Sequence, residues 1–289
     1  MTLLAVPNVS EGRDPSTVAA IGEAFVAAGA RLLDTHVDPD HDRSVFSLAA
    51  EPGALAAALA SGARVAVELI DMRSYRGAHP SVGALDVAPV VHLDASQRGA
   101  ACVEALVTAD ELGRHLGLPV LLYGALAGGR TRAELRRGGL GELARRLEGG
   151  ELAPDFGPSC PQPTAGVTLV AARPPLVAFN LELRPPAGAE DARAIAAAIR
   201  DGGPEGTAGV RAIGIWLADR GLAQVSLNVE DPAATPLWRL VEAVRRHAPV
   251  SGAEVVGLAP RAALREFPRD VPIHGFDPAN QVIENALGL

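Results

Sequence analysis

Apolar and polar positions alternate along this chain in two patterns, and each pattern predicts a different kind of secondary-structure element. Short apolar runs predict strands, and longer runs with an apolar residue every three or four positions predict helices. In the first half, the predicted strands are 3–10, 31–38, 44–51, 84–93 and 118–126. The predicted helices there are 14–29, 53–70 and 97–117, with two shorter helices within 131–150.

The same succession of elements starts again after residues 154–166, a stretch that carries several prolines and glycines. It predicts strand 175–183, helix 189–203, strands 210–218 and 222–230, helix 235–248 and strand 253–259. Strand, helix, two strands, helix and strand is the order of ferredoxin-like domains. We therefore predict an α/β (α+β) fold of two ferredoxin-like βαββαβ sandwich subdomains, 1–172 and 173–289, with a ligand cleft between them. Additional helices are expected in the first subdomain, and a connection is expected near 165–185.

Composition narrows the class of protein. The chain has 289 residues, 48% hydrophobic and 21% charged, which is typical of a globular protein. Its net charge of -8 argues against nucleic-acid and anionic-membrane partners. All 26 basic residues are arginine, so chemistry that needs a lysine, such as Schiff-base formation, is excluded. The N-terminus lacks the pattern of a signal peptide, and we expect a cytoplasmic protein with reduced Cys102 and Cys160.

His79 has an unusual setting, in the stretch YRGAHPSVGALDV. Gly77 and Gly83 permit close backbone approach on either side, and Pro80 fixes the chain direction. The strand that follows carries Asp86, a carboxylate in an apolar run that needs a partner. His79 and Asp86 are therefore candidate catalytic residues. The alternative is a solvated loop histidine next to an aspartate that only caps a turn.

A second polar cluster lies in DTHVDPDHDRSVF, residues 34–46. Its acidic and histidine residues match neither an EF-hand nor a zinc spacing. An Asx-rich turn explains them equally well, so we expect no metal. Arg43, which enters a strand after this turn, is the candidate for binding a substrate carboxylate.

Further candidate binding residues lie in a rigid loop and on strands. The loop from Gly157 to Gly166 contains three prolines, which suits a hinge or the wall of a pocket. Three asparagines lie on or at the end of apolar strands, where a buried amide needs a hydrogen-bond partner from the protein or from a ligand. The candidate binding residues are Asn8, Gly157, Pro158, Ser159, Pro163, Thr164, Gly166, Asn180 and Asn228.

Six motifs, in the same order along the chain, together resemble the glutamate formiminotransferase family. They are AVPNVSEGRD, HDRSVFSLAAEP, RGAHPSVGALDV, PVLLYGALA, PDFGPSCPQPTAGVTLVAARPPLVAFNLEL and AIGIWLADRG. The resemblance implies two ferredoxin-like subdomains with folate between them. It places the catalytic histidine at His79 and the folate loop at Gly157 to Gly166. It also gives Asp86 an orienting role and Arg43 a role as a carboxylate clamp.

The resemblance implies transfer of the formimino group from N-formimino-L-glutamate to tetrahydrofolate, giving 5-formiminotetrahydrofolate and L-glutamate. Tetrahydrofolate is the co-substrate, and no metal is required. The family also implies a homodimer and a separate cyclodeaminase for the next step. Ala78 and Ser81 stand where the family carries a glutamate and an arginine. Two alternatives therefore stay open: a divergent folate-dependent formyl or one-carbon transferase, and a folate-binding protein without catalysis.

Overall fold

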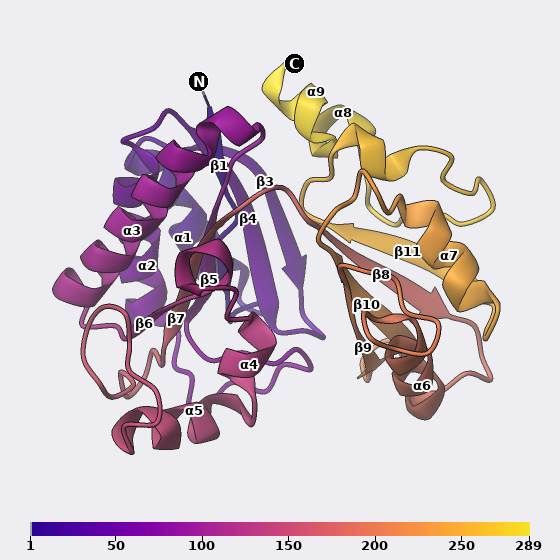
Figure 1. The fold of residues 1–289 in the computed structure, drawn as a ribbon, viewed down its shortest axis with the longest axis horizontal. Helices are drawn as coiled ribbons and strands as arrows, with labels where there is room; N and C mark the ends of the chain where they lie inside the picture. Colours follow the sequence, from indigo (N-terminus) through magenta and orange to yellow (C-terminus); the bar gives the residue numbers. More distant parts are fainter. Residues whose placement is uncertain (1) are drawn as a thin grey trace. The chain divides into compact units, whose positions relative to one another are not determined.

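The computed structural model of the protein describes residues 2–289 and divides into two compact units, Met1–Pro174 and Pro175–Leu289 (Figure 1). Each unit has one β-sheet and its own hydrophobic core. Over residues 2–289, no helix combines the length and apolar composition needed to cross a membrane.

The first unit is a seven-stranded mixed sheet with helices on both faces. Its strands are β1 (Leu3–Ala5), β2 (Asn8–Val9), β3 (Arg31–Asp38), β4 (Arg43–Ala50), β5 (Leu85–Val91), β6 (Val120–Leu122) and β7 (Thr168–Arg173). Its α-helices are α1 (Pro15–Ala27), α2 (Leu55–Leu69), α3 (Arg98–His115), α4 (Arg132–Arg136) and α5 (Gly139–Glu148), with 3₁₀ turns at Ala95–Gln97 and Gly124–Ala127.

The order of strands across this sheet is β3, β4, the β1–β2 pair, β5, β7 and β6. The first four positions form the antiparallel ferredoxin-like core that the sequence predicts. Beyond β5, α3 leads to β6 and β7, and both β5 and β6 pair with β7 in parallel. The unit is therefore extended by strands as well as by helices.

Strand β7 corrects the prediction that the chain near 165–185 is a connection. Thr168–Arg173 is a strand between β5 and β6, and β8 (Val177–Leu183) begins the second unit. Strands covered on both faces form apolar runs without alternation, and such runs carry no period-2 signal. Residues 168–172 are all buried, as are those of β5, which the sequence did predict, so β7 was missed because the prolines and glycines that flank it are typical of a connection.

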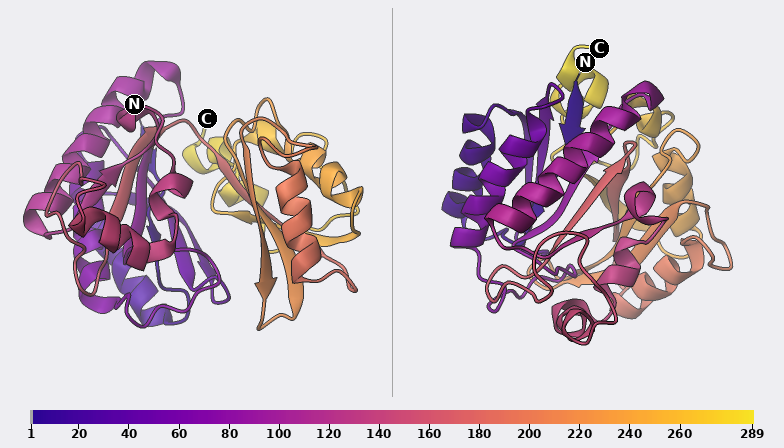
Figure 2. Two further views of the ribbon diagram at one scale, coloured as in Figure 1. Left: turned by 60° about the horizontal axis from the view of Figure 1, so that its bottom comes forward. Right: turned by 60° about the vertical axis from the view of Figure 1, so that its left-hand side comes forward.

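Two cores lie on opposite faces of the first sheet. Helices α1, α2 and α3 form one layer, visible together in both views of Figure 2, and they pack on the sheet through Phe25, Phe46 and Leu59. Helices α4 and α5 cover part of the other face through Leu135 and Leu143.

The second unit is a four-stranded antiparallel sheet in the order β11, β8, β10, β9. Its elements are β8 (Val177–Leu183), α6 (Ala189–Ile199), β9 (Val210–Leu217), β10 (Leu222–Val229), α7 (Leu237–Arg245) and β11 (Val250–Val256), followed by a 3₁₀ turn at Arg261–Leu264, α8 (Pro278–Gln281) and α9 (Ile283–Leu287). This chain order and this strand order are those of a ferredoxin-like domain. The α/β prediction with a βαββαβ core in each unit is therefore confirmed.

Candidate active site

The loop between α2 and β5 presents His79, and the rest of the unit holds this loop in place. The hydroxyl of Tyr75 lies 2.7 Å from the carbonyl oxygen of His79 and 3.0 Å from that of His41. The N–H of Ala78 donates to the carbonyl of Asp40 at 3.1 Å. A Cβ on Gly77 would lie 2.2 Å from the Tyr75 hydroxyl oxygen, so only glycine fits there. The loop thus packs tightly on the turn between β3 and β4.

The imidazole of His79 is a neutral ring whose Nε2 faces an arginine. Arg43 Nη1 lies 3.0 Å from His79 Nε2. A guanidinium only donates, so Nε2 accepts and the proton of the neutral ring belongs on Nδ1. That Nδ1 is buried and makes no hydrogen bond within residues 2–289. Burial lowers the pKa of His79 well below its usual value, and the neighbouring Arg43 and Arg136 lower it further.

His41 is a neighbour of the candidate base that sequence reasoning missed. Its ring stacks on that of His79 with centroids 6.0 Å apart and planes 28° apart. The residue is buried at the turn before Arg43. The sequence pattern assigns this histidine to an acidic turn, and no local spacing connects residue 41 with residue 79.

Asp86 is buried on β5 and pairs with an arginine. Its Oδ1 accepts from the N–H of Val82 at 3.0 Å, and its Oδ2 accepts from Arg136 Nη2. In the described chain these are the hydrogen bonds of the carboxylate, so it does not contact His79 directly. An orienting effect of Asp86 on His79 would have to pass through a neighbour such as Arg136.

Arg136 reaches Asp86 from α4, a five-residue helix. Thr131 and Glu134 form a capping box at its start, and Leu135 anchors it in the core. The sequence did hint at a group of positive charges here, because Arg132 and Arg136 are four positions apart and therefore share one helix face. Asp86 and Arg136 are 50 positions apart, so no local pattern predicts their contact.

Positive charge dominates this site. Burial lowers the pKa of Arg43 to about 10, and it also lowers the pKa of Arg136. The Asp86 carboxylate opposes both shifts by favouring the charged guanidinium. One carboxylate therefore serves two buried cations, and the site can accept a further anion.

Residues at the edge of the site are fixed by short polar contacts. The hydroxyl oxygens of Ser10 and Ser81 are 2.5 Å apart, and the Ser10 hydroxyl donates to the carbonyl of Gly83 at 2.7 Å. Ser81 therefore ties the His79 loop to the end of β2. Asn8 lies on β2, where its side-chain amide donates to the carbonyl of Val6 at 2.8 Å.

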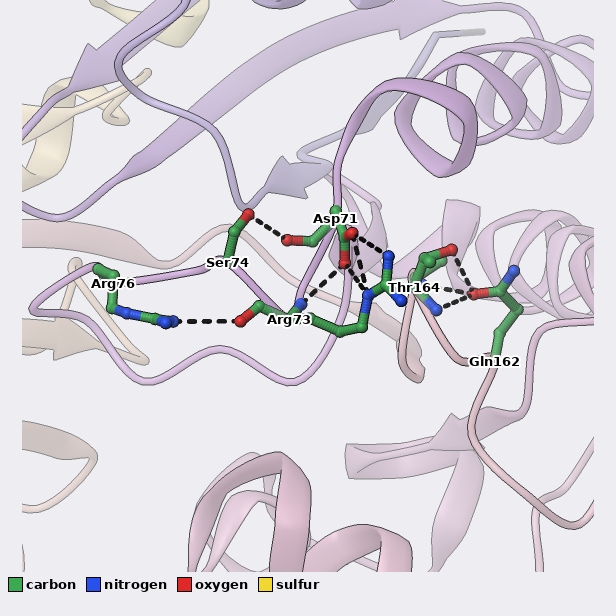
Figure 3. Close-up of polar contacts among 7 residues, drawn as sticks. Asp71, Arg73, Ser74, Arg76, Gln162 and Thr164 are labelled. Carbon is green, nitrogen blue, oxygen red and sulfur yellow. Dashed lines mark hydrogen bonds and ion pairs between the residues drawn. The ribbon is translucent and has the colours of Figure 1, made fainter.

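The candidate folate loop lies beside the loop that precedes His79 (Figure 3). The N–H of Met72 donates to the carbonyl of Thr164 at 2.7 Å. The Gln162 side chain accepts from the N–H and the hydroxyl of Thr164 at 2.7 and 3.0 Å. Gly83 and Gly166 form a β-bridge. The C-terminal half of the candidate loop is thereby joined to the His79 segment.

Two glycines fix the ends of this loop. Gly157 has φ +79°, and a Cβ there would lie 2.1 Å from the carbonyl oxygen of Leu118. Gly166 has φ +72°, and a Cβ there would lie 2.3 Å from the carbonyl oxygen of Val82. Pro158, Ser159 and Pro163 are exposed between these anchors. The loop is therefore rigid at its ends and accessible in its middle.

The two candidate asparagines of the second unit lie on its sheet. Asn180 is buried on β8 and donates to Glu254 Oε2 of β11 at 2.8 Å. Asn228 is half-buried on β10, opposite Ala178 and Arg211. The structure thus brings His79, Arg43 and Asp86 together in the first unit and gives the second unit a polar sheet surface of its own.

Comparisons with known proteins identify the family to which both units belong. Residues 2–173 match the model of the formiminotransferase domain, N-terminal subdomain, and residues 178–268 match the formiminotransferase domain. The chain is 36% identical to the glutamate formimidoyltransferase of Streptococcus pyogenes serotype M1, covering 98% of this chain and 97% of that protein. It is 34% identical to the glutamate formimidoyltransferase of Thermoplasma acidophilum, over 95% and 94% of the two chains.

A third relative is longer. The formimidoyltransferase-cyclodeaminase of Rattus norvegicus is 37% identical over 90% of this chain, and the match spans only 50% of the rat protein. The resemblance found in the sequence motifs is therefore confirmed over both units. The chain belongs to the formiminotransferase family of group-transfer enzymes.

Proposed function

We propose that this protein transfers the formimino group of N-formimino-L-glutamate to tetrahydrofolate, with His79 as the general base and acid. The single observation that carries this proposal is the neutral imidazole of His79 held among buried arginines. A neutral ring can accept a proton at physiological pH, and the arginines suit a substrate that carries carboxylates. The full-length relatives with the name glutamate formimidoyltransferase support transfer of a formimino group that involves glutamate.

The residues present fit a bound folate and an amidine donor. Pro158, Ser159 and Pro163 are accessible in a loop with fixed ends, which suits the flat surface of a pterin or benzoyl ring. His79 Nδ1 and Arg43 Nε are buried polar atoms that lack a hydrogen bond in the described chain. Bound tetrahydrofolate would supply a secondary amine, N5, as the nucleophile toward the amidine carbon.

Proton transfer would then fall to His79. The N5–carbon bond forms and the bond between carbon and the glutamate nitrogen breaks. His79 accepts the proton that N5 releases and returns it to the departing glutamate nitrogen, so that the ring ends neutral as it began. Such a proton shuttle contributes about 10²- to 10⁴-fold to the rate.

Arg43 controls access to this base. In the absence of substrate, Arg43 Nη1 occupies the lone pair of His79 Nε2. A carboxylate is a stronger acceptor for a guanidinium than a neutral imidazole is. The donor's carboxylate would therefore draw Arg43 away and free Nε2 when the substrate is in place.

An assay of the purified protein tests the proposal. We expect 5-formiminotetrahydrofolate to form from N-formimino-L-glutamate and tetrahydrofolate, and we expect His79→Ala to lower kcat by about 10²- to 10⁴-fold. His115→Ala is the matched control, because its ring is exposed at the end of α3. Near-full activity of His79→Ala would show that another group is the base.

The absence of turnover by the wild-type protein would refute the proposed activity. If folate still bound under those conditions, the protein would be a folate-binding member of the family, as Ala78 and Ser81 leave open. Turnover with a formyl donor alone would instead indicate the divergent one-carbon transferase.

A further inference from the structure

The first unit has further arginines next to those of the candidate active site. Arg43 and Arg136 face His79 and Asp86, and Arg132 of the same helix α4 lowers the pKa of both arginines and of His79 through its charge. Within residues 2–289, Asp86 is the carboxylate that pairs with an arginine of this row. Positive charge therefore extends past the residues that the proposed proton transfer uses.

The far end of this row is a cluster of Tyr123, Arg132 and Arg173, which we name the Tyr123 cluster. Tyr123 directly follows β6, and Arg173 is the last residue of β7. The two strands are parallel and adjacent, so their carboxyl ends lie at the same edge of the sheet. The guanidinium carbon of Arg132 lies 5.7 Å from the centre of the Tyr123 ring. Three sequence segments thus converge at one point.

The cluster has polar atoms that the protein itself does not satisfy. The Tyr123 hydroxyl oxygen and Arg173 Nε are both buried, and in the described part of the chain their one polar side-chain contact is a weak one with each other that falls outside ordinary hydrogen-bond geometry. Arg173 Nη1 donates only to the backbone carbonyl of Pro174, at 3.0 Å. Buried donors without acceptors cost free energy, and in native structures they mark the place of a ligand, an ion or a water.

Charge at the cluster points to an anion. Burial and the positive charge of Arg132 lower the pKa of Arg173 and the nearby Tyr123 raises it, and together they bring it to about 10. Two guanidinium groups share this place with no carboxylate among residues 2–289 paired to either. A bound carboxylate would satisfy the guanidinium fork and the hydroxyl together.

We propose that Tyr123, Arg132 and Arg173 form a second carboxylate subsite, separate from Arg43, for a carboxylate of a glutamate moiety. This inference rests on the proposed function for the nature of the ligand. Two reactants carry such a group, namely the formimino donor and the glutamyl tail of the folate. The subsite would fix one end of a polycarboxylate while the reacting atoms lie at His79.

Equilibrium binding tests the subsite without any need for turnover. The probes are N-acetyl-L-glutamate, an unreactive substitute for the donor, and 5-formyltetrahydrofolate, measured by calorimetry with the wild type, Arg173→Gln and Tyr123→Phe. A lost charged hydrogen bond is worth about 1.5–3 kcal/mol. We therefore expect Arg173→Gln to weaken one probe about 10- to 100-fold, and Tyr123→Phe to weaken the same probe by a smaller factor.

The two probes distinguish the two sources of the carboxylate. Weaker binding of N-acetyl-L-glutamate assigns the subsite to the donor. Weaker binding of 5-formyltetrahydrofolate, with an unchanged affinity for the pteroate form that lacks glutamate, assigns it to the folate tail. Arg137→Gln is the matched control, because Arg137 follows α4 and is exposed, and it should change neither affinity.

Unchanged affinity of both probes for Arg173→Gln and Tyr123→Phe would overturn the subsite. Protein stability separates a binding role from a structural one. Since the cluster has excess positive charge, removal of one guanidinium should leave the unfolding midpoint unchanged or raise it. A lower midpoint with unchanged binding would make Arg173 a structural residue. An inactive wild type that still shows the Arg173 effect would refute the proposed transfer and retain the subsite.

Discussion

Polar side chains lie on the sheets of both units, but they are satisfied in different ways. In the second unit, Glu182 pairs with Arg220 at 2.9 Å and with His274 at 3.5 Å, and Asn180 donates to Glu254 at 2.8 Å. In the first unit, the carboxylate of Asp86 serves a row of arginines, and several buried nitrogen and oxygen atoms have no acceptor or donor in the described chain.

The contrast between the two units indicates where a ligand binds. Polar groups that pair with one another are satisfied by the fold itself. Buried groups of one charge sign that lack partners are costly unless something else binds them. The first unit is therefore the part of the molecule whose buried polar groups need a ligand to be satisfied.

The largest expected loss of stability follows from breaking the buried pair of Asp86 and Arg136. Asp86→Asn leaves the Arg136 guanidinium buried without a carboxylate, because the Arg136 side chain is only 11% exposed. Loss of one partner of a buried pair costs about 3–5 kcal/mol. Urea denaturation should therefore show a free energy of unfolding lower by about that amount.

Glu182→Gln in the second unit is the comparison for that variant. The partners of Glu182 reach water, since the side chains of Arg220 and His274 are 37% and 54% exposed. Glu182→Gln should therefore lower the free energy of unfolding clearly less than Asp86→Asn does. Equal losses at Asp86 and Glu182 would contradict the contrast between the units. The double change of Asp86→Leu with Arg136→Met should recover much of the stability, because it leaves no unpaired charge.

A smaller effect is expected where backbone packing fixes the candidate folate loop. Gly157 and Gly221 both have positive φ, at +79° and +63°. A Cβ at Gly157 would collide with the Leu118 carbonyl, whereas a Cβ at Gly221 would meet nothing within 4 Å. Gly221→Ala should cost about 1–2 kcal/mol from the left-handed backbone alone. Gly157→Ala should cost more and should weaken folate binding, and equal unfolding midpoints for the two variants would contradict this.

The smallest effect concerns the dependence of stability on pH. The pKa of His79 lies well below 6.5 in the folded protein, so between that pKa and 6.5 the unfolded chain binds a proton that the folded chain does not. Stability should therefore rise with pH in this window and fall as the pH drops below 6.5. The contribution of one such group is at most about 1.4 kcal/mol per pH unit.

His79→Gln should remove this part of the pH dependence, measured by thermal unfolding from pH 4 to pH 8. His274→Gln in the second unit is the control, because the His274 side chain is largely exposed. An unchanged slope in His79→Gln would mean that the ring titrates normally. For activity, the same lowered pKa predicts that kcat/KM persists below pH 6.5 instead of falling there.

Local patterns predicted much of the fold. The Asp14 cap and Pro15 predicted the start of α1, where Asp14 accepts from the N–H of Ser16 at 3.0 Å. The βαββαβ order of both units also followed from the order in which strand-like and helix-like patterns occur along the chain. Strand β7 was missed because prolines and glycines flank its apolar run, whereas the equally buried β5 was predicted.

The candidate site was predictable only in part. His79, Asp86 and Arg43 drew attention through glycines, proline and charges that lie next to them in the sequence. Arg136, Arg132 and Arg173 did not, because α4 supplies the first two and β7 the third, at least 40 residues further along the chain. Only the packing of α4 against the sheet that contains β7 brings their side chains to that place.

Local patterns and ordered motifs were sufficient to identify the periodic elements, the two ferredoxin-like cores and the family. Which charges are paired could be seen only in the folded chain. Asp86 binds Arg136 instead of His79, and Tyr123, Arg132 and Arg173 gather without an acid. The physical reason is that burial and pairing depend on distances in space, which residues far apart in the sequence acquire only when the sheet is assembled.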